Sequence, residues 1–223
     1  MSVTHASPPQ GALTGPEAPR DCPLCPRLVA YREANRAARP DWWNGAVPSW
    51  GDPDARLLVT GLAPGRGGAN ASGRPFTGDA AGVILYDTLI RTGFATGTYR
   101  ARPDDDVRLH DCMISNAVRC APPANKPEST EEANCRPFLA KRIAALPRLR
   151  VIVTLGDVSR RNVLRALGAR IAGMPAGHGV EMQVGPYTVL NSYHCSRLNT
   201  NTGRLTPEMF EAVFRRVRAI LDA

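Results

Sequence analysis

Residues 56–61 read Arg56-Leu-Leu-Val-Thr-Gly61, a short run of mostly apolar side chains that does not alternate with polar ones and ends in glycine. Such a run is typical of a strand buried on both faces of a parallel sheet. Similar runs predict three more strands, at residues 112–115, 151–155 and 189–192. Helical patterns separate the four runs, so the sequence predicts an α/β fold with a mostly parallel sheet of about four strands.

The helices of this fold are marked by their first residues. Ser129-Thr-Glu-Glu is a capping-box pattern that predicts a helix to about Leu146, and Thr206-Pro207-Glu208 provides an N-cap and a first-turn proline for the last helix. The other predicted helices begin near Arg27, near Val83 and at Asp157. No stretch approaches the roughly 20 apolar residues that a membrane span needs.

The length of 223 residues predicts one domain, and 43% hydrophobic with 22% charged residues is ordinary for a globular protein. Residues 1–18 are rich in Pro, Gly, Ser and Ala, and we expect them to be a disordered lead-in to a single domain over residues 19–223. The first residues have neither the basic segment nor the apolar run of a secretion signal. These features predict a cytoplasmic protein.

Positive charge is in excess, with a formal net charge of +8 and a pI of about 9.6. Much of it lies in residues 141–170, where Asp157 is the single acidic residue. The basic residues of this segment are Lys141, Arg142, Arg148, Arg150, Arg160, Arg161, Arg165 and Arg170. A basic sector favours a polyanionic partner, nucleic acid above all, although a solvated surface would carry the same charges.

Four of the six cysteines are candidate metal ligands. Cys22 and Cys25 have the C-x2-C spacing that lets two thiolates converge on one centre, and Cys120 and Cys135 lie 15 positions apart. This set suits a structural zinc ion or an iron–sulfur cluster, and its loose second pair favours the cluster slightly. The other two cysteines, Cys112 and Cys195, are predicted to be packing residues.

The polar clusters of the chain follow predicted strands. They occupy residues 61–79, 116–126 and 193–204. Because ligands bind at the carboxyl ends of parallel strands, one pocket could collect all three.

The first of these clusters, Gly61-Leu-Ala-Pro-Gly-Arg-Gly-Gly through Phe76-Thr-Gly-Asp79, lacks the Gly-Lys-Ser/Thr of a phosphate-binding loop and breaks the dinucleotide fingerprint. It resembles the first motif of the uracil-DNA glycosylase superfamily. Asn116-Ala-Val-Arg-Cys-Ala-Pro-Pro-Ala-Asn-Lys-Pro and Ser192-Tyr-His-Cys-Ser-Arg-Leu-Asn resemble its later motifs. From about Cys22 to about Phe214 the chain is similar to family 5, the type-b branch.

The resemblance implies a three-layer αβα fold and a [4Fe–4S] cluster with a structural role. The residues that match the cluster ligands of that family are Cys22, Cys25, Cys120 and Cys135. It also implies a monofunctional enzyme that uses water rather than a covalent nucleophile.

Cutting an N-glycosidic bond leaves negative charge on the base and positive charge on the sugar. The resemblance implies that His194 donates to the leaving base and that Asp79 holds the attacking water, assisted by Asn125. Phe76 offers a ring for stacking, although it could equally be core, and Asp79 could merely cap a helix. Ala63 stands where other glycosylase families carry a polar residue.

Asn116 is predicted to read the uracil edge, together with the backbone of Gly61 and Ala63; alternatively its side chain only caps the strand end. Residues after His194 are suited to gripping phosphates on both sides of a flipped nucleotide. They are Arg197, Asn199, Thr200 and Arg204.

The sequence therefore predicts a monomeric DNA-repair hydrolase, cytoplasmic and associated with the nucleoid. We expect it to excise uracil, and also deaminated bases such as hypoxanthine and xanthine, from single- or double-stranded DNA. Two alternatives stay open: a catalytically silent iron–sulfur DNA-binding module, and a relative that cross-links covalently to the abasic sugar.

Overall fold

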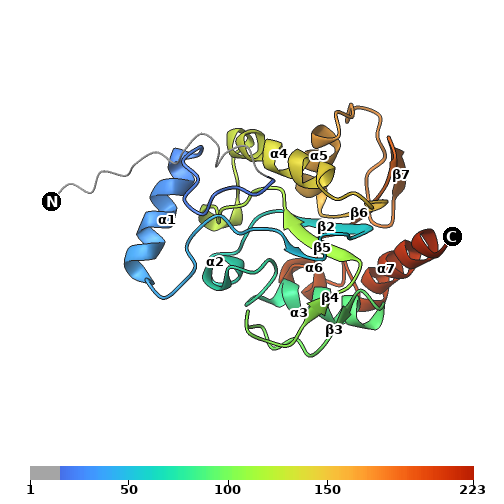
Figure 1. The fold of residues 1–223 in the computed structure, drawn as a ribbon, viewed down its shortest axis with the longest axis horizontal. Helices are drawn as coiled ribbons and strands as arrows, with labels where there is room; N and C mark the ends of the chain where they lie inside the picture. The colour runs from blue at the N-terminus through green and yellow to red at the C-terminus, as the bar shows by residue number, and fades with distance from the viewer. Residues whose placement is uncertain (1–15) are drawn as a thin grey trace.

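The computed structural model describes residues 16–223, whose main sheet has six strands in the order β1-β5-β2-β6-β8-β7 (Figure 1). The strands are β1 (Trp50–Gly51), β2 (Leu57–Gly61), β5 (Cys112–Asn116), β6 (Val151–Leu155), β7 (Glu181–Val184) and β8 (Tyr187–Ser192). The inner four are parallel, as predicted, and β1 and β7 add antiparallel edges that the sequence analysis missed. A separate ribbon pairs β3 (Ala95–Thr96) with β4 (Arg108–Leu109).

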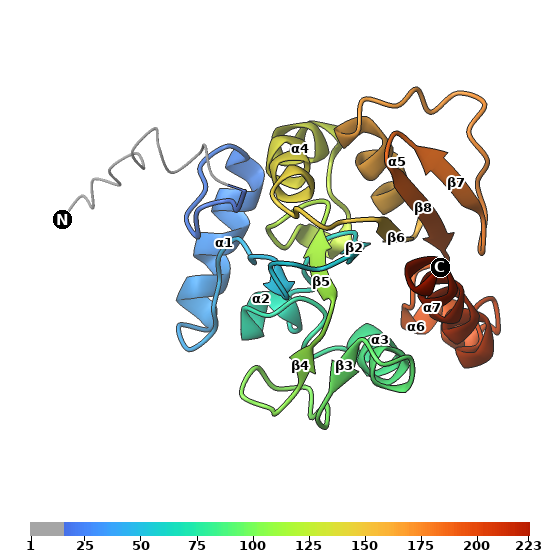
Figure 2. The ribbon, with the colours of Figure 1, turned by 45° about the vertical axis from the view of Figure 1, so that its right-hand side comes forward.

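Helices cover both faces of this sheet, which confirms the three-layer αβα fold. They are α1 (Pro26–Ala38), α2 (Ala69–Ser72), α3 (Ala80–Arg91), α4 (Ser129–Ala144), α5 (Asp157–Ala166), α6 (Arg197–Asn201) and α7 (Pro207–Asp222). α3 and α7 lie on one face, and α4 and α5 on the other (Figures 1 and 2). Along β2, Leu57 and Val59 pack toward α3 and α7, whereas Leu58 packs toward α4 and α5. Both faces of β2 are buried, which explains its unalternated sequence.

Most helix starts agree with the sequence, but the capping box of α4 is displaced. Thr206 accepts from the Met209 N–H at 3.2 Å and caps α7 as predicted. At α4 the N-cap is Glu128 rather than Ser129, and Glu131 accepts from the Glu128 N–H at 2.8 Å. The register moves because the Glu131 carboxylate also takes two hydrogen bonds from Arg27, at 2.8 and 2.7 Å.

The end of the predicted lead-in packs onto the domain. Ala18 is 8% exposed, and Glu17 accepts from the Ser49 N–H and pairs with Arg119 and Arg142 at 3.0 and 2.7 Å. These ion pairs hold the pKa of Glu17 below its ordinary value against the opposing effect of burial. The predicted boundary at residue 18 is therefore late, and residues 1–15 lie outside the described part of the chain.

The basic run 141–170 does not form one free surface. Arg142 is held by Glu17, and Arg150 donates to the carbonyls of Ile220 and Leu221 at the end of α7. Arg160 and Arg161 both pair with Asp157. Part of the predicted polyanion-binding sector is thus engaged within the fold. Among the helices of residues 16–223, none combines the length and apolar character needed to cross a bilayer.

Candidate active site

The loops that follow β2, β5 and β8 meet at one edge of the sheet, as predicted. The ends of β2 and β5 are paired in parallel register, Gly61 with Asn116. A cavity of about 30 Å³, here named the strand-end cavity, lies beside them. It is lined by Ala63, Pro64, Gly65, Ala69, Phe76, Asp79, Ala81, Asn116 and His194. Five predicted site residues therefore share one cavity.

Phe76 and Asn116 approach the backbone where β2 ends. The Phe76 ring lies 6.2 Å from the His194 ring, centroid to centroid, at an interplanar angle of 27°. A Cβ on Gly61 would fall 2.5 Å from both the Asn116 Oδ1 and the Phe76 Cζ. Glycine is required there so that both side chains can reach the cavity. Phe76 also belongs to the core between the sheet, α3 and α7, so both interpretations of this ring hold.

Asp79 caps a helix, as one of its two predicted roles requires, and also lines the strand-end cavity. Its Oδ1 accepts from the Gly82 N–H at 3.2 Å and caps α3. Its Oδ2 lies against the glycine-rich loop, where a Cβ would come within 2.6 Å of it at Gly68 and 3.3 Å at Gly65. The cap orients the carboxylate, and the two glycines leave room for it beside the cavity.

His194 is held from two sides in a largely desolvated position. A Cβ on Gly156, whose φ is +89°, would lie 3.3 Å from the His194 Cβ, and the Asn199 side chain donates to the His194 carbonyl at 2.8 Å. Burial lowers the pKa of the imidazole below 6.5, although the nearby Asp79 acts in the opposite direction. The ring is neutral at pH 7 and can donate through its single N–H.

Residues that the sequence analysis did not identify brace the turn that presents Phe76. Arg74 is buried, pairs with Asp105 at 2.7 Å and donates to the Thr77 hydroxyl. This pairing contributes to lowering the pKa of Asp105 to about 2 despite the opposing effect of burial. Phe76 itself has a φ of 54°, a conformation that a bulky residue adopts only when its surroundings impose it.

A larger hollow of about 470 Å³, the Arg204 hollow, adjoins the strand-end cavity because His194 lines both. Two predicted phosphate-binding residues, Asn199 and Arg204, line it, and the Arg204 guanidinium lies 4.5 Å from the Tyr193 ring centroid. Arg197 is exposed and Thr200 half-buried on α6, outside the hollow's lining.

Asn125 is not brought into the strand-end cavity. It is exposed in the 3-10 helix Pro123–Asn125, with a φ of 56°, and does not line either hollow. The predicted assistance of Asn125 to the attacking water stays a prediction. Cys195 is buried, with its thiol 3.5 Å from the Ala81 carbonyl oxygen, and packs as predicted.

The four cysteines predicted to be metal ligands also lie close together. Cys22, Cys25, Cys120 and Cys135 line a single apolar cavity of about 20 Å³ between α1 and α4, here named the four-cysteine cavity. Burial, with a smaller effect of the neighbouring thiols, raises the pKa of Cys120 to about 12 and that of Cys135 to about 11, although Arg119 acts in the opposite direction on Cys135. Cys112 is buried in the core instead.

Nitrogen donors already face these sulfurs. The Arg119 backbone N–H lies 3.2 Å from the Cys135 Sγ, and the Asn134 side chain lies 3.8 Å from the Cys25 Sγ. The Arg119 side chain is 1% exposed and lines the cavity, and its Nε and Nη2 have no hydrogen-bond partner in the described structure. Buried donors without acceptors are costly, and these two belong to a residue of the cavity lining. Within residues 16–223, no three or more His, Cys, Asp or Glu side chains are arranged to hold a single metal ion.

Comparison with known proteins decides the family. The sequence profile of the Uracil DNA glycosylase superfamily matches residues 48–218. The chain belongs to this superfamily. It is 44% identical over 205 residues to the type-5 uracil-DNA glycosylase of Thermus thermophilus, covering 89% of this chain and 93% of the relative. The type-5 enzyme of Pyrobaculum aerophilum is 41% identical over 203 residues, covering 89% of this chain and 88% of the relative.

A type-4 uracil-DNA glycosylase, also from Pyrobaculum aerophilum, is 33% identical over 152 residues, covering 68% of this chain and 63% of the relative. The superfamily match begins at residue 48 and so includes the strand-end cavity but not Cys22 and Cys25. The type-5 relatives extend the likeness over most of the chain. The resemblance and the fold that it implied are thereby confirmed.

Proposed function

We propose that this chain removes uracil from DNA by hydrolysing the bond between the base and its deoxyribose, leaving an abasic site. The strand-end cavity carries the proposal, because it gathers Phe76, Asp79, Asn116 and His194 in a member of the uracil-DNA glycosylase superfamily. A base turned out of the DNA stack needs a ring to lie on and polar groups that read its edge. This cavity has both.

The chemistry follows from the two charges that the reaction creates. When the bond between C1′ and the base breaks, its electron pair leaves with the base, and the N–H of neutral His194 stabilises the resulting anion. The Asp79 carboxylate stabilises the cationic sugar and orients a water molecule. The water oxygen bonds to C1′, one of its protons is released, and the departing base is protonated. A neutral imidazole can fill this role because it keeps one N–H to donate.

Asn116 supplies the selection of the base. Its amide can donate to one group of the uracil edge and accept from another, and a base with the wrong pattern leaves that buried amide unpaired. Asn116 is 3% exposed, so an unpaired amide would be costly. We therefore propose that uracil is the best substrate and that hypoxanthine and xanthine are excised more slowly.

The four-cysteine cavity is proposed to hold a [4Fe–4S] cluster that braces the segment leading to Asn116. A single tetrahedral zinc ion, with bonds of about 2.3 Å, would need sulfurs about 3.8 Å apart. Four thiols around one cavity, with no group compact enough for a single ion in the described chain, suit a larger cluster. The orphaned donors of Arg119 support an occupant that accepts hydrogen bonds.

The setting of the activity is also proposed. The chain acts as a monomer on single- or double-stranded DNA, in the cytoplasm and at the nucleoid. A silent DNA-binding module would leave uracil in place, and a cross-linking relative would remain attached to the abasic sugar.

The test is strand cleavage by alkali after incubation with a uracil-containing oligonucleotide, under single-turnover conditions. Asp79→Asn keeps the shape of the side chain and removes its charge, so we expect a rate reduction of roughly 10²–10³-fold with DNA binding retained. Asp87→Asn is the matched control, because Asp87 is exposed on α3 and pairs only with Arg91 in the described structure. An unchanged rate in Asp79→Asn moves the active site elsewhere.

A further inference from the structure

A third and larger hollow adjoins the glycine-rich loop that lines the strand-end cavity, whereas the Arg204 hollow adjoins that cavity through His194. Its volume is about 620 Å³, and its lining includes Gly67, Gly68 and Gly78. Gly68 is the residue whose missing Cβ leaves room for the Asp79 carboxylate, and Gly78 directly precedes Asp79. The glycine-rich loop therefore contacts both this hollow and the Asp79 carboxylate.

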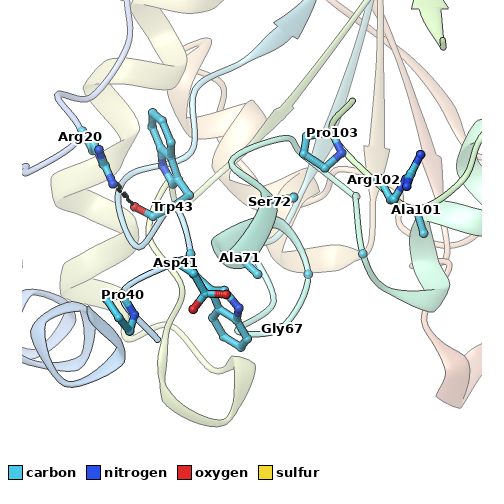
Figure 3. A pocket seen from close by; sticks show the side chains of 13 residues that line it. Arg20, Pro40, Asp41, Trp43, Gly67, Ala71, Ser72, Ala101, Arg102 and Pro103 are labelled. Carbon is cyan, nitrogen blue, oxygen red and sulfur yellow. Dashed lines mark hydrogen bonds between the residues drawn. The ribbon is translucent and has the colours of Figure 1, made fainter. Parts of the chain in front are cut away.

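Two tryptophans and two arginines belong to the other walls, together with Pro40, Asp41, Ala71, Ser72, Ala101 and Pro103 (Figure 3). Trp42 and Trp43 come from the loop after α1, Arg20 lies above the Trp43 ring at 4.5 Å, and Arg102 comes from the loop before β4. We name this hollow the tryptophan groove. Its one acidic lining residue, Asp41, is paired with Arg39 at 3.3 Å. The groove is thus aromatic with a positive balance.

The groove is built onto the catalytic loop rather than being a chance gap between loops. The Trp43 backbone N–H donates to the Ala71 carbonyl at 3.0 Å, and the Asn70 side chain donates to Asn44 at 3.0 Å. A Cβ on Gly73, whose φ is +76°, would lie 3.0 Å from the Trp43 ring. The tryptophan loop is therefore docked on α2, and α2 follows directly from the glycine-rich loop.

We propose that the tryptophan groove binds the nucleotides that flank the extruded nucleotide on one side of the damaged strand. This inference rests on the proposed function, and it assigns a binding site that the motifs do not contain. A strand with one nucleotide extruded must continue in both directions from the strand-end cavity. The Arg204 hollow adjoins that cavity through His194, and the tryptophan groove adjoins it through the glycine-rich loop.

The chemistry of the groove fits a single strand of nucleic acid. Arginines lie over both tryptophan rings, and such positive charge beside the groove favours the phosphates of a strand. A hollow of about 620 Å³ falls within the range of about 300–1,000 Å³ typical of small-molecule sites, which suits about one or two nucleotides. A rigid duplex would need a wider surface, so the damaged strand alone is the expected occupant.

The experiment uses three single-stranded oligonucleotides that carry a stable abasic-site analogue at the centre, at the 5′ end or at the 3′ end. When the analogue is at one end of the oligonucleotide, no nucleotides flank it on that side. Arg20→Ala and Arg102→Ala are compared with the wild type by equilibrium binding at several salt concentrations. The control is Arg148→Ala, an exposed arginine at the opposite, amino-terminal end of the sheet.

We expect each groove variant to weaken binding about fivefold for the central analogue and for one of the two end analogues. Binding of the other end analogue should not change, and the salt slope should fall by about one for each phosphate that the substituted arginine neutralises in the wild type. Equally weakened binding of both end analogues, or unchanged binding of all three, would overturn the proposal. Because the analogue has no base, this outcome is separate from the uracil assay, in which the wild type alone tests the proposed function.

Discussion

The strand-end cavity and the four-cysteine cavity are lined by one short segment of chain, yet they differ in how many of their polar groups have hydrogen-bond partners. Asn116 lines the first, and Arg119 and Cys120 line the second. In the strand-end cavity the polar groups are already oriented: Asp79 caps α3, and Asn199 holds the backbone at His194. In the four-cysteine cavity Arg119 has two unsatisfied donors.

The two cavities are therefore held in shape in different ways. The strand-end cavity is positioned by the fold itself, through a helix cap and paired strand ends. We propose that the four-cysteine cavity depends in addition on the cluster that it would hold. The segment between them is anchored to β2 and its loop, since Ala117 donates to the Gly61 carbonyl and Val118 to the Leu62 carbonyl, both at 3.0 Å. We therefore expect removal of the occupant to disturb the strand-end cavity.

The largest effect is expected from removing a thiol of the four-cysteine cavity. Cys120→Ala should abolish the broad absorbance near about 400 nm that thiolate-bound iron–sulfur clusters give, and should destabilise the protein, because metal-binding free energy contributes to folding. Cys112→Ala is the control, since Cys112 is in the core, and it should keep the colour. Absorbance, iron content and thermal unfolding measure both variants. A colourless wild type that holds only zinc would contradict the cluster.

A substitution of His194 tests the strand-end cavity. His194→Ala should slow single-turnover uracil excision by roughly 10²–10³-fold while leaving the iron content unchanged, because the leaving base no longer receives a hydrogen bond from the imidazole. His110→Ala is the control, since His110 is exposed in the β3–β4 ribbon.

The pKa of His194 also predicts how the excision rate depends on pH. Burial lowers the pKa of His194 below its ordinary 6.5, so the ring stays neutral as the pH falls through that value. The wild-type excision rate should therefore show no step attributable to His194 between about pH 8 and about pH 6.5. A titration step near 6.5 that disappears in His194→Ala would contradict the buried, neutral ring.

The parallel core of the sheet could be predicted because strands buried on both faces carry continuous apolar runs. β1 has two residues and β7 four, too few for a pattern to emerge from single residues. The site residues of the motifs were found because they follow strands and resemble known motifs. The Arg74–Asp105 pair was missed because its members lie 31 positions apart, although Asp105 stands within a run of three aspartates. Nor can burial of Arg119 be read from local sequence.

Substitution of Asn116 is expected to have a more moderate effect, which is on the choice between uracil and other bases. Asn116→Ala should reduce the preference for uracil over hypoxanthine by about thirtyfold, the equivalent of about 2 kcal/mol for an amide that pairs only with the correct edge. Most of the change should be slower uracil excision rather than faster hypoxanthine excision. Rates on matched oligonucleotides measure the ratio. If the wild type excises both bases equally fast, Asn116 does not read the base.

The smallest effect is expected from substitution of Arg119. It tests whether this side chain acts on a cluster in the four-cysteine cavity. With a cluster bound, the buried positive charge of Arg119, which already acts on Cys135, would favour the more negative, reduced state. Arg119→Met should therefore make reduction by dithionite harder by about tenfold, which is about 59 mV for one electron. Arg119→Lys keeps the charge but not the planar donor set, so it should shift the potential less.

The control for Arg119 is Arg142→Met. Both arginines pair with Glu17, at 3.0 and 2.7 Å, but only Arg119 lines the four-cysteine cavity in the described chain. A shift common to both variants would reflect the removal of a Glu17 ion pair and would contradict a direct interaction with the cluster. A shift confined to Arg119, with the uracil excision rate changed far less than in His194→Ala, would mean that the chain between Asn116 and Cys120 serves two sites by different means. At one end it places a side chain that reads a base, and at the other it supplies donors that satisfy a buried cofactor.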